Sequence, residues 1–189
     1  MRNTIIYLIG HYGVGKLTVA KAICTVADAR LFDNHLANNV IFSLIRVDGK
    51  TPLPDRVWEM IGVIRDQALF AIEELTPPGA SFVLTNCLRE NDPMDCAAYE
   101  QVENLAARRN SVFVPVILRA SDAAHAERVP APDRAERLKH TDVEGAAHKR
   151  RTSELLRINH SNLLTLDTSE LSPKEAAQRI ITHAEGYAK

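Results

Sequence analysis

The sequence predicts an α/β fold: a doubly wound, parallel, five-stranded sheet with helices on both faces. Short apolar runs alternate along the chain with longer segments of helical periodicity, and parallel strands need such crossover connections. The 189 residues, of which 46% are hydrophobic and 25% charged, suffice for one domain with a substantial core. We therefore treat residues 1–189 as a single domain.

The first half of the chain supplies two strands and three helices. Thr4–Ile9 is a nearly unbroken apolar run, which is typical of a strand buried on both faces. Apolar residues at helical spacing follow over Lys16–Ala27. A short strand ends at Phe32, and helices are expected over Leu36–Ile45 and Asp55–Leu75, the second ended by a Pro-Pro-Gly sequence.

The second half contributes three further strands. Ser81–Leu84 begins the third strand, and a helix over Met94–Arg109 leads to the fourth, Val112–Leu118. Pro115 within this run indicates a position away from the centre of the sheet, because proline cannot donate a ladder hydrogen bond. Leu163–Leu166 is the fifth strand.

The final helix has clear boundaries in the sequence. Ser172 and Pro173 are typical first residues, and we expect the helix to run from Pro173 to Glu185 and stop at Gly186. In parallel sheets of this kind, ligands bind outside the carboxyl ends of the strands. The turns that follow the five strands are therefore the places to look for a site.

The turn after the first strand carries the strongest functional signal. It matches the first seven positions of the Walker A pattern G-x-x-x-x-G-K-[ST], which binds phosphates. Glycines let backbone N–H groups point at an anion, the following helix presents its positive end, and the lysine adds a charge for the β- and γ-phosphates. The residues expected to bind nucleotide here are Gly10, His11, Tyr12, Gly13, Val14, Gly15, Lys16, Leu17 and Thr18. An ordinary glycine-rich turn is the alternative interpretation.

The Walker A pattern fails at its last position. Leu17 stands where a hydroxyl would bind Mg²⁺, and the hydroxyl comes one residue later, at Thr18. Because leucine cannot coordinate a metal, Mg²⁺ must rely more on water, on nucleotide oxygens and on a carboxylate. We expect ATP and Mg²⁺ as cofactors, with Thr18 and Asp33 as candidate metal ligands.

Composition and missing motifs exclude several other classes. The 23 basic and 24 acidic residues give a net charge of −1, which does not suit a protein that coats nucleic acid or an anionic membrane. Three cysteines without a C-x-x-C pair fit a reducing compartment, so we expect a cytoplasmic protein. The sequence contains neither an N-K-x-D guanine motif nor G-x-G-x-x-G, which disfavours a GTPase switch and a dinucleotide oxidoreductase.

At this point the chain resembles a family. An N-terminal Walker A run, an acidic residue after the second strand and an arginine-rich segment before the last strand are similar to the small-molecule P-loop kinases, which include shikimate kinase, gluconate kinase and the nucleoside monophosphate kinases. The layout covers most of the chain, but only the phosphate loop matches residue by residue. The resemblance implies an ATP-dependent phosphotransferase that moves the γ-phosphate to a hydroxyl of a small molecule.

Shikimate kinase offers the most further matches. Its D-x-D after the second strand keeps its first residue here as Asp33, with His35 in the second place, and its R-x-x-E segment is matched by Arg56 and Glu59. Residues 86–89 stand where that enzyme has three glycines, so shikimate itself is not indicated.

The resemblance also implies roles for single residues. Lys16 would hold the donor phosphates, and Asp33 would accept the hydroxyl proton or hold Mg²⁺. Arg56, Asn86 and Arg89 would contact an acidic or polar acceptor.

Residues 119–157 are expected to form a mobile, arginine-rich lid. Arg128 matches the arginine that packs on adenine in that family, and Arg137 would close over the transferring phosphate. The residues that would help Arg137 are Arg134, Arg150 and Arg151.

Each of these assignments has a structural alternative. Asp33 would serve equally as a helix cap, and Arg56 as a residue of a solvated helix face. Arg89 has Glu90 and Asp92 as ion-pair partners nearby in the sequence. The basic run at residues 149–151, with an acidic residue one turn later, is typical of a solvated face.

Two other functions remain open from the sequence. A nucleotide-binding regulatory or vestigial P-loop protein without phosphotransfer would explain Leu17. A polynucleotide-end kinase would need a basic track, which the net charge of −1 disfavours.

Overall fold

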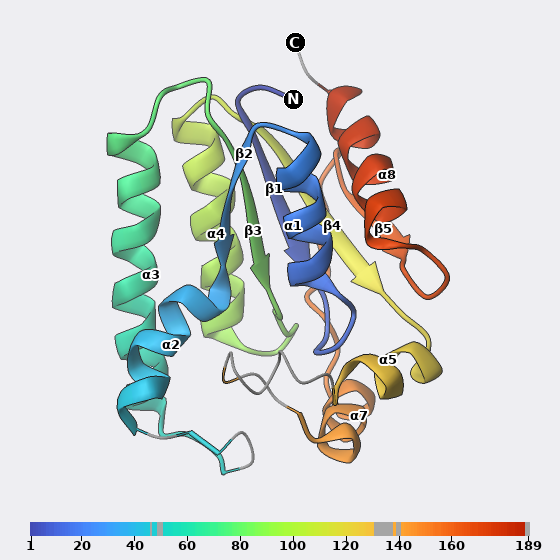
Figure 1. Cartoon of the computed structure of the whole chain (residues 1–189). Helices are drawn as coiled ribbons and strands as arrows, with labels where there is room; N and C mark the ends of the chain where they lie inside the picture. Colours follow the sequence, from blue (N-terminus) through green and yellow to red (C-terminus); the bar gives the residue numbers. More distant parts are fainter. Residues whose placement is uncertain (46, 49–50, 131–137, 139–140, 188–189) are drawn as a thin grey trace.

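The computed structural model describes residues 1–45, 47–48, 51–130, 138 and 141–187. Strands and helices alternate along them (Figure 1). In chain order they are β1 Thr4–Ile9, α1 Lys16–Val26, β2 Ala29–Asp33, α2 Asn34–Ile45, α3 Asp55–Leu75, β3 Ser81–Asn86, α4 Pro93–Arg108, β4 Val112–Arg119, α5 Asp122–Arg128, α7 Val143–Thr152, β5 Leu164–Asp167 and α8 Pro173–Glu185. Within this part of the chain, no helix is long and apolar enough to cross a membrane.

The sheet has five strands in the order β2-β3-β1-β4-β5, and all neighbours are parallel. This confirms the predicted doubly wound α/β fold. Helices α1 and α8 cover one face of the sheet, and α3 and α4 cover the other (Figure 1). The phosphate loop follows β1, the middle strand.

The sequence of strand β1 is a nearly unbroken apolar run because both of its faces are buried. Ile6 and Leu8 pack into the core beneath α1 and α8, whereas Ile5, Tyr7 and Ile9 pack into the core beneath α3 and α4. Successive side chains of a strand point to opposite faces, so a strand buried on both faces consists mainly of apolar residues.

Two elements extend further toward the site than the sequence predicted. Strand β3 continues beyond Leu84 to Asn86, because Thr85 and Asn86 pair with the last two residues of β1. Helix α2 starts at Asn34, directly after Asp33, instead of at Leu36. Both differences place polar residues at the carboxyl end of the sheet within regular structure.

Pro115 is accommodated off the centre of the sheet, as predicted. β4 lies between β1 and the edge strand β5, and its pairing with β5 starts only at Val116. The carbonyls of Phe113 and Arg119 accept hydrogen bonds on the β5 side, from the Asn162 side chain and from the backbone after β5. Pro115 is separated from these two residues by an even number of positions, so its backbone also faces the β5 side of β4. No residue of β5 pairs with it there, and the missing N–H of the proline breaks no ladder hydrogen bond.

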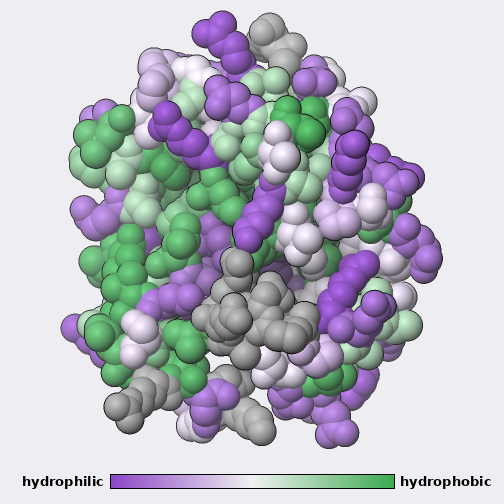
Figure 2. Space-filling model, viewed as in Figure 1, coloured by the Kyte–Doolittle hydropathy of each residue, from purple (hydrophilic) through white to green (hydrophobic). Residues whose placement is uncertain are grey.

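Helices α2 and α3 pack against each other beside the main sheet. Ala37, Ile41 and Phe42 of α2 form a small cluster with Ile61 of α3. Figure 2 shows hydrophobic residues on the side of the molecule where these helices lie. The exposed apolar side chains there include Leu36, Val40, Leu44, Val63 and Phe70. The helix pair therefore has one apolar side in the core and another at the surface.

Candidate functional site

The loop between β1 and α1 has the backbone shape of an anion cradle. Gly13 and Gly15 have φ angles of 84° and 91°, in the left-handed region that favours glycine. The Gly10 N–H donates to the Asn86 carbonyl at 3.2 Å, which fixes the start of the loop against the end of β3. The loop therefore stands at the carboxyl end of the sheet, as the sequence predicted.

Lys16 folds back into this loop from the first residue of α1. Its Nζ donates to the carbonyl oxygens of Gly10 at 2.6 Å and His11 at 2.9 Å. The N-terminus of α1 has no side-chain cap and no acidic residue in its first turn. The N–H groups of that turn, which have no acceptor within the helix, and the lysine charge therefore create a positive potential suited to phosphate.

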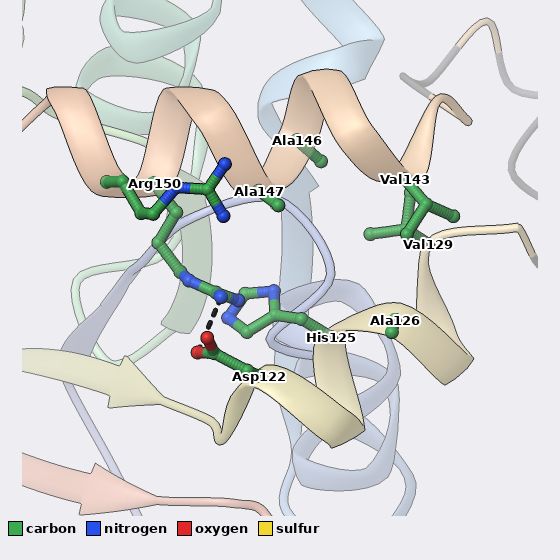
Figure 3. A pocket seen from close by; sticks show the side chains of 9 residues that line it. Asp122, His125, Ala126, Val129, Val143, Ala146, Ala147 and Arg150 are labelled. Carbon is green, nitrogen blue, oxygen red and sulfur yellow. Dashed lines mark ion pairs between the residues drawn. The ribbon is translucent and has the colours of Figure 1, made fainter.

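Helices α5 and α7 form a wall beside the loop. His125 of α5 is 6% exposed and lies under Gly13, where an added Cβ would be 3.0 Å from its Nδ1. Arg150 of α7 pairs with Asp122 of α5 at 2.5 Å, and its side chain crosses the gap between the helices next to the His125 ring (Figure 3). These three residues line a cavity of about 200 Å³.

A second cavity, of about 440 Å³, opens directly beside the phosphate loop. It shares His125 and Arg150 with the first cavity and adds His11 of the loop and Arg119 at the end of β4. The segment after α7 closes it with the apolar residues Leu155 and Leu156 and with the charged residues Glu154 and Arg157. Its volume falls in the range of small-molecule sites, and its charged lining is mainly cationic.

The two histidines beside the loop stay neutral at physiological pH. Burial lowers the pKa of His11 to about 4, and the positive charge of Lys16 adds to the shift. Burial and the charge of Arg150 likewise lower the pKa of His125 to about 4, although a hydrogen bond with the Tyr12 backbone opposes the shift. Burial is the main cause of both shifts, and the charges of Lys16 and Arg150 lower both pKa values further.

These pKa values predict a loss of stability in mild acid. Between about pH 6.5 and 4 the unfolded chain binds protons at His11 and His125 that the folded protein does not, so the free energy of unfolding falls as the pH falls through this window. For His125 the slope is at most about 1.4 kcal/mol per pH unit. Urea unfolding at several pH values measures it.

The His125→Gln variant should flatten this pH dependence, because glutamine does not titrate. His148→Gln is the matched control, since His148 is an exposed histidine of α7. Equal pH dependence of His125→Gln and the wild-type protein would contradict the pKa assigned to His125.

The acceptor side of the site lies at the ends of β2 and β3. Asp33 is 8% exposed, and its carboxylate accepts a 2.5 Å hydrogen bond from the Thr85 hydroxyl. Asn86 is 7% exposed; its Nδ2 donates to the Tyr7 hydroxyl at 3.1 Å and its Oδ1 accepts from the Cys87 N–H. Both polar atoms of the Asn86 side chain thus have hydrogen-bond partners within the protein.

The two arginines predicted to hold the acceptor have protein partners. Arg56 forms an ion pair with Glu59 at 2.9 Å, and its side chain is 79% exposed. Arg89 donates to both Asp92 and Asp95. The solvated-face alternative therefore describes the state of Arg56, and the ion-pair alternative describes that of Arg89, with Asp95 as a partner that the sequence did not suggest.

Arg128 reaches the segment that follows β5. It donates to the Thr168 hydroxyl at 3.2 Å and to the carbonyls of Thr168 and Ser169. The Thr168 hydroxyl in turn lies 3.0 Å from the Val14 carbonyl and 3.1 Å from that of Arg119, and it donates to one of them at a time. Arg128 is thereby connected to the phosphate loop through Thr168.

Of the remaining arginines in the predicted lid, Arg134 and Arg137 lie outside the described residues. The interpretation of residues 149–151 as a solvated face is wrong for Arg150, whose side chain is 15% exposed because it bridges to α5. Lys149 places its Nζ 5.6 Å from the centre of the Tyr12 ring.

The residues offer few ligands of their own to a metal. Leu17 is half-buried and has no donor atom, and Thr18 is exposed on the first turn of α1. Among the described residues, no group of three or more His, Cys, Asp or Glu side chains is placed to hold an ion. Asp33 and Thr18 therefore fit only an ion whose other ligands are water and phosphate oxygens.

Sequence reasoning missed Arg119 and His125. A signal for His125 existed: Ser121 caps α5, and this start places His125 and Arg128 one helical turn apart on the segment after the fourth strand. No local pattern indicates Arg119, because its role depends on the cavity beside β4.

No family model and no curated protein matches the sequence. Solved structures match over almost the whole chain. A gluconokinase from Sinorhizobium meliloti 1021 is 15% identical with a TM-score of 0.59, and the match covers 98% of this chain and 94% of that one. The shikimate kinase from Aquifex aeolicus VF5 is 15% identical with a TM-score of 0.50, and the match covers 97% of this chain and 97% of that one. The Mycobacterium tuberculosis APS kinase, solved with AMPPNP and APS, is 17% identical with a TM-score of 0.57, and the match covers 97% of this chain and 98% of that one.

The chain therefore has the fold of the small-molecule P-loop kinases. Shikimate kinase and gluconokinase, the enzymes that its sequence resembles, are among its structural neighbours, which confirms the resemblance at the level of the fold. Identities of 14–19% leave the substrate to be argued from the site itself.

Proposed function

We propose that the protein is an ATP-dependent phosphotransferase that moves the γ-phosphate of ATP to a hydroxyl of a small molecule. One observation carries the proposal. The phosphate loop, with Lys16 held inside it, opens beside a cavity that is lined by Arg119 and Arg150. This arrangement concentrates positive charge where a triphosphate would lie.

The donor phosphates would be held mainly by the loop. Its N–H groups and the positive end of α1 would bind the phosphate oxygens, and Lys16 would exchange its two carbonyl partners for β- and γ-phosphate oxygens. Arg128 would contact the base, since it lies against the segment after β5. This binding would position the γ-phosphate above the end of β1.

In the transfer step, the acceptor hydroxyl oxygen would form a bond with the γ-phosphorus while the bond from that phosphorus to the β–γ bridging oxygen breaks. The proton of the hydroxyl would pass to the Asp33 carboxylate, and ADP would leave with the bridging oxygen. Asp33 suits this role because the Thr85 hydroxyl orients its carboxylate at the carboxyl end of the sheet. Mg²⁺ would arrive with ATP as part of the substrate.

Residues 119–157 would act as the lid. The Arg150–Asp122 ion pair joins α5 to α7, so the two helices would move as one unit over the loop. Arg137 would then neutralise the transferring phosphate from this segment, with help from Arg134 or Arg151.

Nucleotide binding and acceptor screening test the proposal. ATP with Mg²⁺ should raise the melting temperature by several degrees, and ADP release should rise above background with at least one member of a library of small hydroxyl compounds. An unchanged melting temperature with ATP, ADP and GTP would refute it.

One observation favours a second function, nucleotide binding without phosphotransfer. Leu17 removes the hydroxyl that would bind Mg²⁺. A protein of this kind would bind ATP tightly and release no ADP with any acceptor in the library.

Replacing Leu17 with serine separates the two functions. If the protein is a kinase, Leu17→Ser supplies a metal ligand, and the Mg²⁺ concentration for half-maximal activity should fall several-fold. Activity titrations with Mg²⁺ measure this value, and Leu17→Ala is the control for the lost leucine side chain. An unchanged Mg²⁺ requirement would show that the position takes no part in metal binding.

A further inference from the structure

Helix α3 carries an exposed stripe of residues at the spacing of a coiled-coil seam. Its members follow one another in alternating steps of four and three residues, and all of them are exposed. We call this set the α3 stripe; its members are Arg56, Met60, Val63, Gln67, Phe70 and Glu74. Ile61, Leu69 and Ile72 are buried on the opposite side of the helix. The outer side of α3 thus has the pattern of a surface that packs on another helix.

Helix α2 extends the apolar surface beside α3 (Figure 2). Its 12 residues include no charged side chain, and Leu36, Val40 and Leu44 are 58%, 50% and 76% exposed. With the apolar members of the α3 stripe, they expose an area on the order of 700 Å², which exceeds the roughly 300–600 Å² of the largest apolar patch on a typical monomer. Each partner of a standard protein interface contributes about 800 Å². The surface is therefore large enough for a stable dimer.

The α3 stripe is symmetric about the middle of the helix. Its members lie two, five and nine positions on either side of residue 65. When two copies of α3 run antiparallel about a two-fold axis at this residue, Met60 of one copy faces Phe70 of the other. Val63 likewise faces Gln67. Steps of four and three residues keep two such stripes in contact along the whole pair, at a crossing angle of about 20°.

The two ends of the α3 stripe carry opposite charges. In the antiparallel pair, Arg56 of each copy faces Glu74 of the other. The two residues cannot meet within one chain, because about 27 Å of helix separates them. Arg56 pairs with Glu59 in the single chain, but these side chains are 79% and 55% exposed, and such a surface pair is weak enough to exchange partners. The charges of the stripe thus complement those of a second copy.

The charge of the two helices disfavours a membrane as the partner of this surface. Helix α3 contains five acidic and two basic residues, and α2 contains neither kind. Glu59 and Asp66 are exposed beside the α3 stripe. A helix that lies on an anionic lipid surface has lysine or arginine next to its apolar side, whereas carboxylates at these positions are repelled.

We propose that α2 and α3 form the interface of a homodimer, in which the α3 helices of two copies pack antiparallel about a two-fold axis near residue 65. Gln67 is the polar member inside the stripe, and one polar residue in such a seam favours a single register. The dimer forms whether or not the protein transfers phosphate, so its test needs no assay of activity.

Sedimentation equilibrium of the full chain is the first test. Between about 1 and 100 μM the protein should reach twice the mass of one chain. Val63→Glu should raise the dimer Kd at least about 100-fold, because the two-fold axis places the new carboxylate in the interface twice. Val26→Glu is the matched control, since Val26 is 55% exposed on α1, at the other face of the sheet, and its Kd should equal that of the wild-type protein. A wild-type monomer at the highest concentration, or a dimer that Val63→Glu leaves intact, would overturn the proposal.

Exchange of the end charges tests the antiparallel arrangement. Arg56→Glu and Glu74→Arg should each raise the Kd about 10-fold, because like charges then face each other between the copies. The double variant should restore the wild-type Kd, and this restoration can only arise between copies because the two positions are too far apart in one chain. A double variant that dimerises no more tightly than the single variants would overturn the arrangement.

Other partners of the surface give different results. A monomer that floats with vesicles of phosphatidylcholine and phosphatidylglycerol would assign the surface to a membrane and overturn the proposal. A monomer that binds no vesicles would overturn it as well, and would leave the surface to a different protein.

Discussion

Replacing Lys16 with alanine should lower kcat/KM for phosphoryl transfer about 100- to 1000-fold, because the loop loses its only side-chain charge for the β- and γ-phosphates. The fold should survive, since the lysine side chain donates to the carbonyls of Gly10 and His11, which water can reach once the side chain is removed. Steady-state ADP release and the melting temperature measure the two effects.

Lys21→Ala is the matched control for this variant. Lys21 lies on the same helix, at an exposed position away from the loop, and its loss should change neither ATP affinity nor turnover. A Lys16→Ala protein that binds ATP and turns it over as well as Lys21→Ala does would contradict the role of the phosphate loop.

Replacing Gly13 with alanine should destabilise the protein by about 2–4 kcal/mol. The residue has a φ of 84°, which L-amino acids with a Cβ rarely adopt. The new methyl group would also lie 2.8 Å from Cγ2 of Val129 and 3.0 Å from Nδ1 of His125, so α5 would have to move away from the loop. Urea unfolding gives the free energy, and ATP titration gives the accompanying loss of affinity.

Gly15→Ala separates strain from steric conflict. Gly15 has a similar φ of 91°, but an added Cβ would meet no atom within 4 Å. Its loss of stability should therefore be about 1 kcal/mol, from backbone strain alone. Equal losses for the two variants would show that the contact between the loop and α5 contributes nothing.

Local patterns were sufficient to predict most of the fold. Helix α3 runs from Asp55 to Leu75 as its periodicity predicted, and α8 starts at the capping box of Ser172 and Glu175. The end of β3 and the start of α2 were harder to predict from the sequence. The polar residues at the end of β3 pair with β1, and the Thr85 hydroxyl accepts a hydrogen bond from the first N–H of α2. Such pairing involves residues distant in sequence.

In the candidate site, too, local patterns were predictable and contacts between distant residues were not. The phosphate loop was predictable because one contiguous segment contains its glycines and its lysine. The acceptor side was not, because Arg56 and Glu59 form an R-x-x-E pattern that also describes an exposed ion pair one helical turn apart.

Thr168 has a consequence for how the protein is made. The chain is synthesised from its N-terminus, so the phosphate loop leaves the ribosome early. Its Val14 carbonyl, however, lies 3.0 Å from a hydroxyl that follows β5, and Arg128 joins the same residue from α5. A nascent chain that ends before this threonine lacks this contact to the loop and retains the hydrogen bond from Gly10 to Asn86. If the proposed function is correct, we expect nucleotide binding to appear late, after the last strand has emerged and docked.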